Sequence, residues 1–284
     1  MSVNRGWTSQ KDFIGFVNPL AKKFHSSSTD IYSLIKQMNE ESKDKEIYDN
    51  TPMSFIILDE ANLSPLEHYW SSFYNLTDST GMLEVKLGHN ETVKFPNNLR
   101  FIGTINYDHT TEELSPRVLD RINIIQLPKS EEINFSAISS AEIKNIRLSF
   151  GRWTSFLQPT TDNSLKFQGS EYEDAYKDIK SQFKTLKIIV SPRVELAIQK
   201  YISLASNCMS DTKKPLDYCV AQRLLPLINL QGSESKPKLE FLKQILQKHN
   251  LKISENILDE IIKKGSEDGI YKDNFNYFLT LSNV

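Results

Sequence analysis

Two short apolar runs in the first half of the chain lack the polar alternation of a half-exposed strand. Residues 54–59 read SFIILD, and residues 99–105 read LRFIGTI. Such continuous runs are typical of strands that are buried on both faces of a parallel sheet. A third apolar piece, residues 122–127, stops at Pro128 and predicts another strand. The first half is therefore predicted to contain a parallel sheet.

Other segments of this half alternate or follow a helical period. Residues 83–95 (LEVKLGHNETVKF) alternate on either side of a Gly-His-Asn turn, which predicts a β-hairpin. Residues 13–19 predict another hairpin, or a short strand and a turn. Apolar residues at helical spacing predict one helix after Asp30, a candidate N-cap, and another over residues 66–73. Strands and helices together indicate an α/β fold.

Beyond Pro128 the apolar pattern becomes helical. Ser191 and Pro192 form a helix start signal, and an apolar stripe follows them over residues 194–205. A second stripe lies at residues 239–246. A third helix is predicted from Ser254, as its cap, to a stop at Gly265.

Length and composition fit this division. With 284 residues, 39% of them hydrophobic and 25% charged, the chain can hold two domains with cores of their own. We place them at residues 1–128 (α/β) and 129–284 (helical). A net charge of −2 gives no indication of direct nucleic-acid binding. No apolar run approaches the roughly 20 residues of a membrane helix, and Cys208 and Cys219 lack metal-ligand spacing. A soluble, cytoplasmic protein is expected.

The candidate chemistry follows the two continuous runs. Asp59 and Glu60 come at the end of the first, and Asn106 follows the second. The carboxyl ends of parallel strands share one edge of a sheet, so these side chains should meet there. One carboxylate can hold Mg²⁺ through water, the next can activate an attacking water, and the asparagine can hold that water. The simpler alternatives are an acid pair that caps the next helix and an asparagine in a turn.

Two arginines precede the third predicted strand. Arg117 and Arg121, in the segment LSPRVLDR, are four residues apart and would share a helix face. The planar guanidinium suits phosphate because it donates two hydrogen bonds at once. The alternative is a surface pair bonded to nearby acids such as Asp120 or Glu113.

The order of these pieces resembles an AAA+ ATPase and, within that group, the McrB-like, helix-2-insert branch. Residues 54–76 resemble its Walker B strand and the following helix, and residues 83–106 resemble its pre-sensor hairpin and sensor 1 strand. Residues 114–123 resemble its arginine-finger segment, and residues 7–20 its insert hairpin. Ser191-Pro-Arg193 resembles sensor 2 in the lid. The resemblance covers nearly the whole chain.

The resemblance implies an AAA+ parallel sheet with flanking helices, followed by an α-helical lid domain. It also implies a role for each matching residue. Asp59 would be the metal-side Walker B acid, Glu60 would be the catalytic glutamate, and Asn106 would be sensor 1. Arg121, with Arg117 as second choice, would be the arginine finger that acts on a neighbouring subunit, and Arg193 would be sensor 2, which reaches the γ-phosphate.

One family motif is missing from the sequence. The phosphate-binding loop reads Gly-x-x-x-x-Gly-Lys-Ser/Thr, and none of the ten glycines here precedes a lysine. In the family this loop lies upstream of the segment that residues 1–20 resemble, so the chain is expected to start at the second strand. Nucleotide affinity should then be very weak. The sheet should be incomplete, with residues 122–127 displaced or unusually paired and an open edge that favours association.

Two functions are compatible with these features. The first is a fragment of an McrB-like motor in DNA restriction or phage defence, which is inactive alone and binds no cofactor by itself. Its intact family uses Mg²⁺ with ATP or GTP, forms rings, works with an McrC-like nuclease and meets nucleic acid indirectly. The alternative is a non-catalytic scaffold subunit that acts in trans on an intact AAA+ neighbour. A metal-dependent hydrolase is a third reading, but the five histidines show no ligand spacing.

Overall fold

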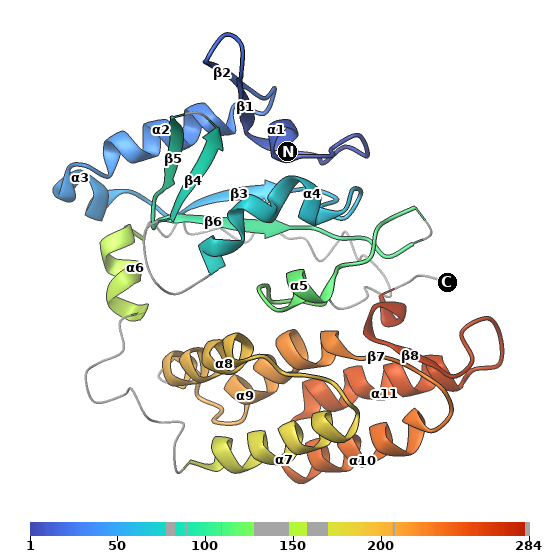
Figure 1. The fold of residues 1–284 in the computed structure, drawn as a ribbon. Coiled ribbons are helices and arrows are strands. Elements are labelled where there is room, and N and C mark those ends of the chain that lie inside the picture. The colour runs from blue at the N-terminus through green and yellow to red at the C-terminus, as the bar shows by residue number, and fades with distance from the viewer. Residues whose placement is uncertain are drawn as a thin grey trace, which may run out of the picture.

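The computed structural model describes residues 1–77, 83–88, 90–108, 110–127, 148–157, 170–206 and 208–281. It is a mixed α/β structure. Short strands and helices up to residue 127 form one part, and helices from residue 170 onward form the other (Figure 1). None of the described helices combines the length and apolar character of a membrane span.

A parallel pair of strands forms the centre of the first part. β3 (Ser54–Leu58) pairs with β6 (Leu99–Gly103), with Ser54 opposite Leu99 and Leu58 opposite Gly103. Residues 1–3 run parallel to the other side of β3, where the Asp59 N–H donates to the Met1 carbonyl at 2.8 Å. The predicted parallel pairing is therefore present, as two paired strands and a parallel bridge to residues 1–3.

Only one face of this pair is buried. Ile56 and Leu58 point into the first hydrophobic core, whereas Phe55, Ile57 and Ile102 are 54%, 50% and 47% exposed. The prediction of burial on both faces is wrong. The apolar run is continuous, but strand side chains alternate between faces, and the described residues leave the second face open to solvent.

Residues 122–127 form no strand, which corrects the third strand prediction. The Ile124 N–H donates instead to the Gln222 carbonyl at 3.0 Å, and the Ile124 side chain is buried. Ile125 and Leu127 remain 68% and 79% exposed. The backbone of residues 122–127 thus runs beside the helical part rather than within a sheet.

The hairpin predicted at residues 83–95 is confirmed, because β4 (Leu83–Gly88) pairs with β5 (Glu91–Phe95). The segment 13–19, predicted as a hairpin or as a strand and a turn, supplies only the first strand of a longer hairpin, in which β1 (Gly15–Asn18) pairs with β2 (Lys23–Ser26). Gly15 is required in this longer hairpin, because its φ is +121° and a Cβ there would lie 2.3 Å from the His25 carbonyl oxygen.

Helices surround these strands. The predicted helix after Asp30 is confirmed, although the Asp30 side chain makes no capping hydrogen bond. The helix at residue 66 ends early and continues as a 3₁₀ helix. The helical elements of this part are α1 (Gln10–Phe13), α2 (Ile31–Glu41), α3 (Lys45–Asn50), α4 (Leu66–Trp70), the 3₁₀ helix η1 (Ser71–Thr77) and α5 (Pro116–Leu119).

The helical part is organised around long helices and one small hairpin. Ser191 caps α8 as predicted, because its hydroxyl accepts from the Val194 N–H. The elements are α7 (Glu171–Thr185), α8 (Pro192–Ala205), α9 (Lys214–Cys219), the π-helix η3 (Val220–Leu224), the 3₁₀ helices η4 (Leu225–Leu227) and η5 (Tyr277–Thr280), β7 (Asn229–Gln231), α10 (Ser235–Lys248), α11 (Lys252–Ser266) and β8 (Asn274–Asn276).

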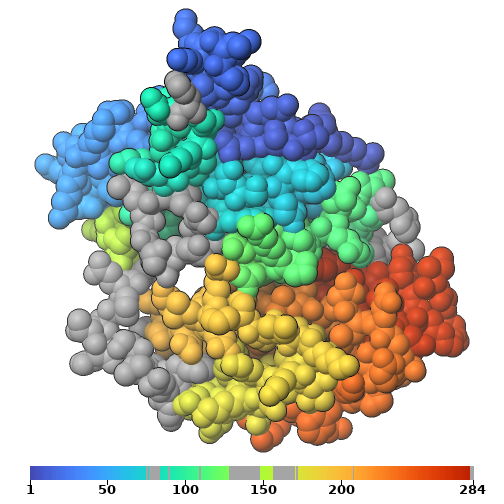
Figure 2. All heavy atoms as spheres, viewed as in Figure 1, coloured from blue at the N-terminus to red at the C-terminus, as the bar shows by residue number. Residues whose placement is uncertain are grey.

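The two parts share packing. Leu119 and Ile124 from the first part belong to the hydrophobic core of the helical part. In Figure 2 the green segment around α5 lies between the cyan α/β part and the yellow-to-red helices. The domain boundary predicted between residues 128 and 129 lies outside the described residues. Helix α6 (Phe150–Leu157), which follows it, packs on α3, with the Phe150 ring 4.9 Å from that of Tyr48.

Helix α11 begins and ends differently from the prediction. Ser254 is not its cap, because the helix starts at Lys252 and Ser254 is fully buried in its first turn. The cap is Asp217 from α9: its carboxylate accepts from the Ile253 N–H at 2.9 Å and the Ser254 N–H at 2.8 Å. Gly265 lies inside the helix, where a Cβ would be 2.4 Å from Phe275.

We expect Asp217→Ala to lower the free energy of unfolding by about 2–3 kcal/mol, since the buried first turn of α11 would lose its acceptor. Urea denaturation measures the change. Asp259→Ala is the matched control: this α11 residue pairs with Lys243 at the surface, so its loss should cost at most about 0.5 kcal/mol. Equal effects of the two changes would contradict this account of the cap.

Candidate functional site

The carboxyl ends of β3 and β6 are held in fixed register beyond the strands themselves. The Thr104 N–H donates to the Leu58 carbonyl at 2.9 Å, and the Ala61 N–H donates to the Thr104 carbonyl at 2.7 Å. The chain segments that carry Asp59 and Asn106 therefore leave the sheet side by side, as parallel pairing requires.

Thr104 links the two predicted acids. Its hydroxyl donates to Asp59 Oδ1 at 2.7 Å and accepts from the Glu60 N–H at 2.9 Å. One hydroxyl thus orients the Asp59 carboxylate and fixes the backbone that carries Glu60. The sequence gives no signal for Thr104, because a threonine inside an apolar run has no distinguishing pattern.

Glu60 and Asn106 meet as predicted. Asn106 Nδ2 lies 3.4 Å from Glu60 Oε1, a long hydrogen bond. Glu60 adopts a left-handed backbone conformation with φ of +53°, which non-glycine residues rarely adopt. The turn after β3 thereby directs the glutamate toward the end of β6 instead of into a following helix.

Buried Asn62 is the second residue that the sequence prediction missed. Its Nδ2 donates to the Asn106 carbonyl at 2.7 Å and the Glu112 carbonyl at 3.1 Å, and its Oδ1 accepts from the Asn106 N–H at 3.3 Å. The Asn62 side chain therefore holds the backbone of Asn106 through both its N–H and its carbonyl group. Its only sequence signal is a position two residues after Glu60.

A second group of polar residues joins the two parts of the molecule at Asp120. The Asp120 carboxylate accepts from the Ser191 hydroxyl and from Arg193 Nη1, and it lies 3.8 Å from Arg121 Nη1. Arg223 Nη1 donates to the Asp120 carbonyl at 3.3 Å. The alternative reading of Arg121 as a partner of Asp120 thus has a structural basis, and Arg193 is held by the same carboxylate.

The two candidate finger arginines share one aromatic ring. Arg117 and Arg121 lie 5.1 and 4.9 Å from the centre of the Tyr74 ring, at cation–π distance. The Arg121 side chain is only 12% exposed, and its Nη1 donates to the Arg117 carbonyl at 2.9 Å. Arg117 is exposed. Of the two, Arg117 is the one that another molecule can reach in this conformation.

Burial and charge shift the protonation of this second group. Burial alone would raise the pKa of Asp120, but hydrogen bonds from Ser191 and Arg193 and the charges of Arg193 and Arg121 lower that pKa overall. Burial, with the charge of Glu67, raises the pKa of Tyr74 to about 12 although the two arginines oppose the rise. Asp120 is therefore a stable anion that the arginines neutralise.

The oxygen donors at the strand ends fit a hard divalent cation. Asp59, Glu60 and the Thr104 hydroxyl offer the ligand type that Mg²⁺ prefers. Within the described ranges, no three His, Cys, Asp or Glu side chains gather closely enough to hold a metal ion by themselves. Mg²⁺ characteristically completes its shell with water and substrate phosphates. Asp59, Glu60 and Thr104 are therefore the described residues at these strand ends that could take part in holding such a cation.

Comparison with known proteins gives one partial match. A family described as a domain of unknown function (DUF8727) matches residues 142–271, which is less than half of the chain. No curated protein matches the chain, and no solved structure does. The matched range includes Arg193, whereas Asp59, Glu60, Asn106, Arg117 and Arg121 all lie before it.

We expect Asp120→Asn to destabilise the protein by about 1–3 kcal/mol at neutral pH, because it removes a charged hydrogen-bond acceptor. The folded pKa of Asp120 lies below its unfolded value of about 3.9. Its contribution is therefore complete above that value and is lost as the pH falls through the folded pKa. Urea midpoints of both proteins measured down to strongly acidic pH should converge. A difference that is independent of pH would count against this role of the charge.

The left-handed backbone at Glu60 predicts an inverted order of two variants. Glycine normally destabilises relative to alanine by about 0.5–1 kcal/mol, but at this φ it should be the more stable of the two by about 1 kcal/mol. Both Glu60→Gly and Glu60→Ala remove the carboxylate, so their difference isolates the backbone effect. Chemical denaturation gives the answer, and a more stable alanine variant would show that residue 60 is not held in this conformation.

Proposed function

We propose that this chain is the hydrolytic and lid-bearing portion of an AAA+ motor of McrB-like type, active only together with a phosphate-binding loop that its sequence lacks. The observation that carries the proposal is the arrangement of Asp59, Glu60, Thr104 and Asn106 at adjoining carboxyl ends of two parallel strands. Ligands of parallel sheets bind at this position.

These residues can perform distinct parts of phosphoryl transfer to water. Asp59 is oriented by Thr104 and would hold the hydration shell of Mg²⁺. Glu60 would orient and deprotonate the attacking water, while Asn106 would fix that water from the adjacent strand. Mg²⁺ with ATP or GTP would supply the metal ion and the transferred phosphoryl group.

The small size of the described sheet is compatible with the same proposal. Residues 1–3, β3 and β6 lie in parallel order, β6 pairs only with β3 among the described residues, and residues 122–127 have no strand partner. A sheet that lacks one strand beside β6 would have these features. The open apolar face, with Phe55 and Ile57, is a further surface that such a sheet would need to cover.

The helical part supports a role as lid. Arg193 lies in the first turn of α8, where backbone N–H groups favour an anion, and it is tied through Asp120 to the segment that carries Arg117. Movement of this part would therefore be transmitted to the arginine segment. We propose Arg117 as the arginine that acts on a neighbouring subunit, because it is the exposed member of the pair.

The partners proposed with this function are other AAA+ subunits in a ring and a nuclease subunit of McrC-like type, in DNA restriction or phage defence. A second candidate is a non-catalytic scaffold subunit that presents Arg117 to an intact neighbour. The exposed arginine and the lack of any Gly-Lys pair favour it. The organised acid pair favours the motor, because a scaffold has no use for Glu60.

Hydrolysis measurements on an assembly separate these functions. The isolated chain should release no phosphate from ATP or GTP. The chain purified together with an AAA+ subunit that carries a phosphate-binding loop should release phosphate. Arg117→Ala should lower kcat roughly 10³-fold, as removal of an arginine finger does. Arg152→Ala, an exposed arginine on α6, is the matched control and should leave kcat unchanged.

Glu60→Gln tells the two candidates apart. A loss of turnover comparable to that of Arg117→Ala supports the motor, whereas unchanged turnover beside an Arg117→Ala defect supports the scaffold. Turnover by the chain alone, or an assembly indifferent to both variants, would overturn the proposed function.

A further inference from the structure

The β1–β2 hairpin projects from the α/β part on the side away from the helical part (Figure 1). Figure 2 shows its blue atoms at the tip of the molecule, at the top of the view. All residues of the hairpin lie within the described ranges. Its turn is open to solvent, since Leu20 is 95% exposed. A large ligand can therefore reach this element.

One face of the hairpin attaches it to the molecule. Val17 of β1 is opposite Phe24 of β2, and both are half-buried. The Phe24 ring stacks on Tyr32 of α2, with 3.9 Å between ring centres. A Cβ at Gly88, the last residue of β4, would lie 3.6 Å from Val17 Cβ. Contacts with α2 and β4 therefore hold this face in place.

The opposite face of the hairpin carries two aromatic rings and a cation. Side chains alternate along a strand, so Phe16, Lys23 and His25 point away from the attached face. The rings of Phe16 and His25 are stacked across the two strands, with 5.6 Å between their centres and 22° between their planes. Phe16 is 42% exposed, and Lys23 and His25 are also exposed. These three residues form the outer face of the hairpin.

Positive charge gathers at the turn of the hairpin. Residues 15–29 contain Lys22 and Lys23 but neither aspartate nor glutamate. The flanking acids, Asp12 and Asp30, come at the other end of the hairpin, before β1 and after β2. Both lysines are exposed. The turn can therefore attract an anionic ligand, although the net charge of the whole chain is −2.

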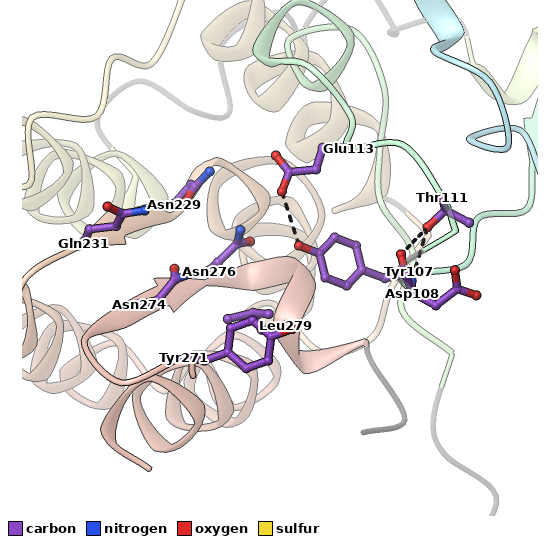
Figure 3. A pocket seen from close by; sticks show the side chains of 10 residues that line it. All are labelled: Tyr107, Asp108, Thr111, Glu113, Asn229, Gln231, Tyr271, Asn274, Asn276 and Leu279. Carbon is purple, nitrogen blue, oxygen red and sulfur yellow. Dashed lines mark hydrogen bonds between the residues drawn. The ribbon is translucent and has the colours of Figure 1, made fainter. Parts of the chain in front are cut away.

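Another stacked pair of rings in the molecule serves packing. Tyr107 and Phe278 lie 5.8 Å apart between ring centres, and Phe278 is buried. The Tyr107 hydroxyl lies 3.5 Å from Glu113 Oε1 (Figure 3). This pair joins the segment after β6 to the helical part. The pair of Phe16 and His25 also stabilises its hairpin, but its rings remain exposed beside two lysines. It thus combines features that suit a ligand with flat rings and anionic groups.

We propose that the outer face and the adjacent turn bind single-stranded nucleic acid. An unpaired base can stack on the exposed rings of Phe16 and His25, while the lysines attract the neighbouring phosphates. A duplex presents the same phosphates, but its base faces are covered by adjacent bases. The site is separate from the Asp59 and Glu60 cluster and does not depend on the function proposed for it.

Fluorescence anisotropy on the full chain tests this proposal, with labelled oligothymidine and oligouridine of about 16 nucleotides as probes. At low salt, at least one of them should bind saturably. Phe16→Ala should weaken this binding at least about tenfold, because a base loses its stacking partner. Phe16→Tyr keeps the ring and should retain most of the affinity. Phe241→Ala is the matched control, since Phe241 of α10 is 54% exposed on the helical part, and should leave binding unchanged.

The salt dependence of binding tests the lysines. Each phosphate contact on a single strand adds about 0.7 to the slope of log affinity against log salt concentration. The double variant Lys22→Ala, Lys23→Ala should therefore reduce the magnitude of this slope by about 1.4. Lys263→Ala removes an exposed lysine of α11 and should leave the slope unchanged.

Duplex DNA, polyglutamate and phosphatidylserine vesicles serve as comparison probes. The proposal fails if neither oligonucleotide binds at low salt, if Phe16→Ala leaves the affinity unchanged, or if the double lysine variant leaves the slope unchanged. It also fails if a comparison probe binds through the same residues as tightly as the oligonucleotides, since the hairpin would then recognise negative charge, a protein or a membrane rather than unpaired bases. Circular dichroism of each variant confirms that the fold is intact.

Discussion

The parallel pairing of β3 with β6 is the constraint on which the candidate site depends. These strands are far apart in the sequence, yet their register places Leu58 opposite Gly103 and so brings Asp59 next to Thr104. The same register brings Glu60 next to Asn106, although the hydrogen bond between their side chains is too long to hold them together by itself. A shift of register by one residue would turn the polar side chains to opposite faces and disperse the site.

The second constraint is the anion at Asp120. It lies at the end of α5, yet it accepts from Ser191 and Arg193 at the start of α8, so the helical part and the arginine segment are positioned by one carboxylate. Shared apolar packing through Leu119 and Ile124 reinforces this connection. Any motion that separates the two parts must break these charged hydrogen bonds. A nucleotide phosphate that attracts Arg193 would compete with Asp120 for the same guanidinium.

Local patterns were predicted from the sequence more successfully than tertiary contacts. The hairpin at residues 83–95 and the start of α8 at Ser191 depend on neighbouring residues, and both are confirmed. Residues 122–127 have strand composition but no strand partner, because partners are supplied by distant segments.

The site shows the same division between local and distant information. Asp59, Glu60 and Asn106 could be selected because each follows an apolar run, and parallel pairing implied that they meet. Thr104 and Asn62 could not be selected, because their importance lies in hydrogen bonds to residues 44 or 45 positions away. The sequence does not predict that Asp217 caps α11 for the same reason, because Asp217 is distant in sequence from that helix. Local capping preferences indicate Ser254 instead.

Nucleotide binding tests most directly the proposal that the chain carries hydrolytic residues without the loop that grips the phosphates. Calorimetric titration of the full chain with Mg²⁺ and ATP, and separately with Mg²⁺ and GTP, is the measurement. The proposal predicts no saturable heat with either nucleotide. Tight one-to-one binding of either nucleotide would contradict it, because the phosphates would then be held by residues outside the Asp59, Glu60 and Asn106 cluster.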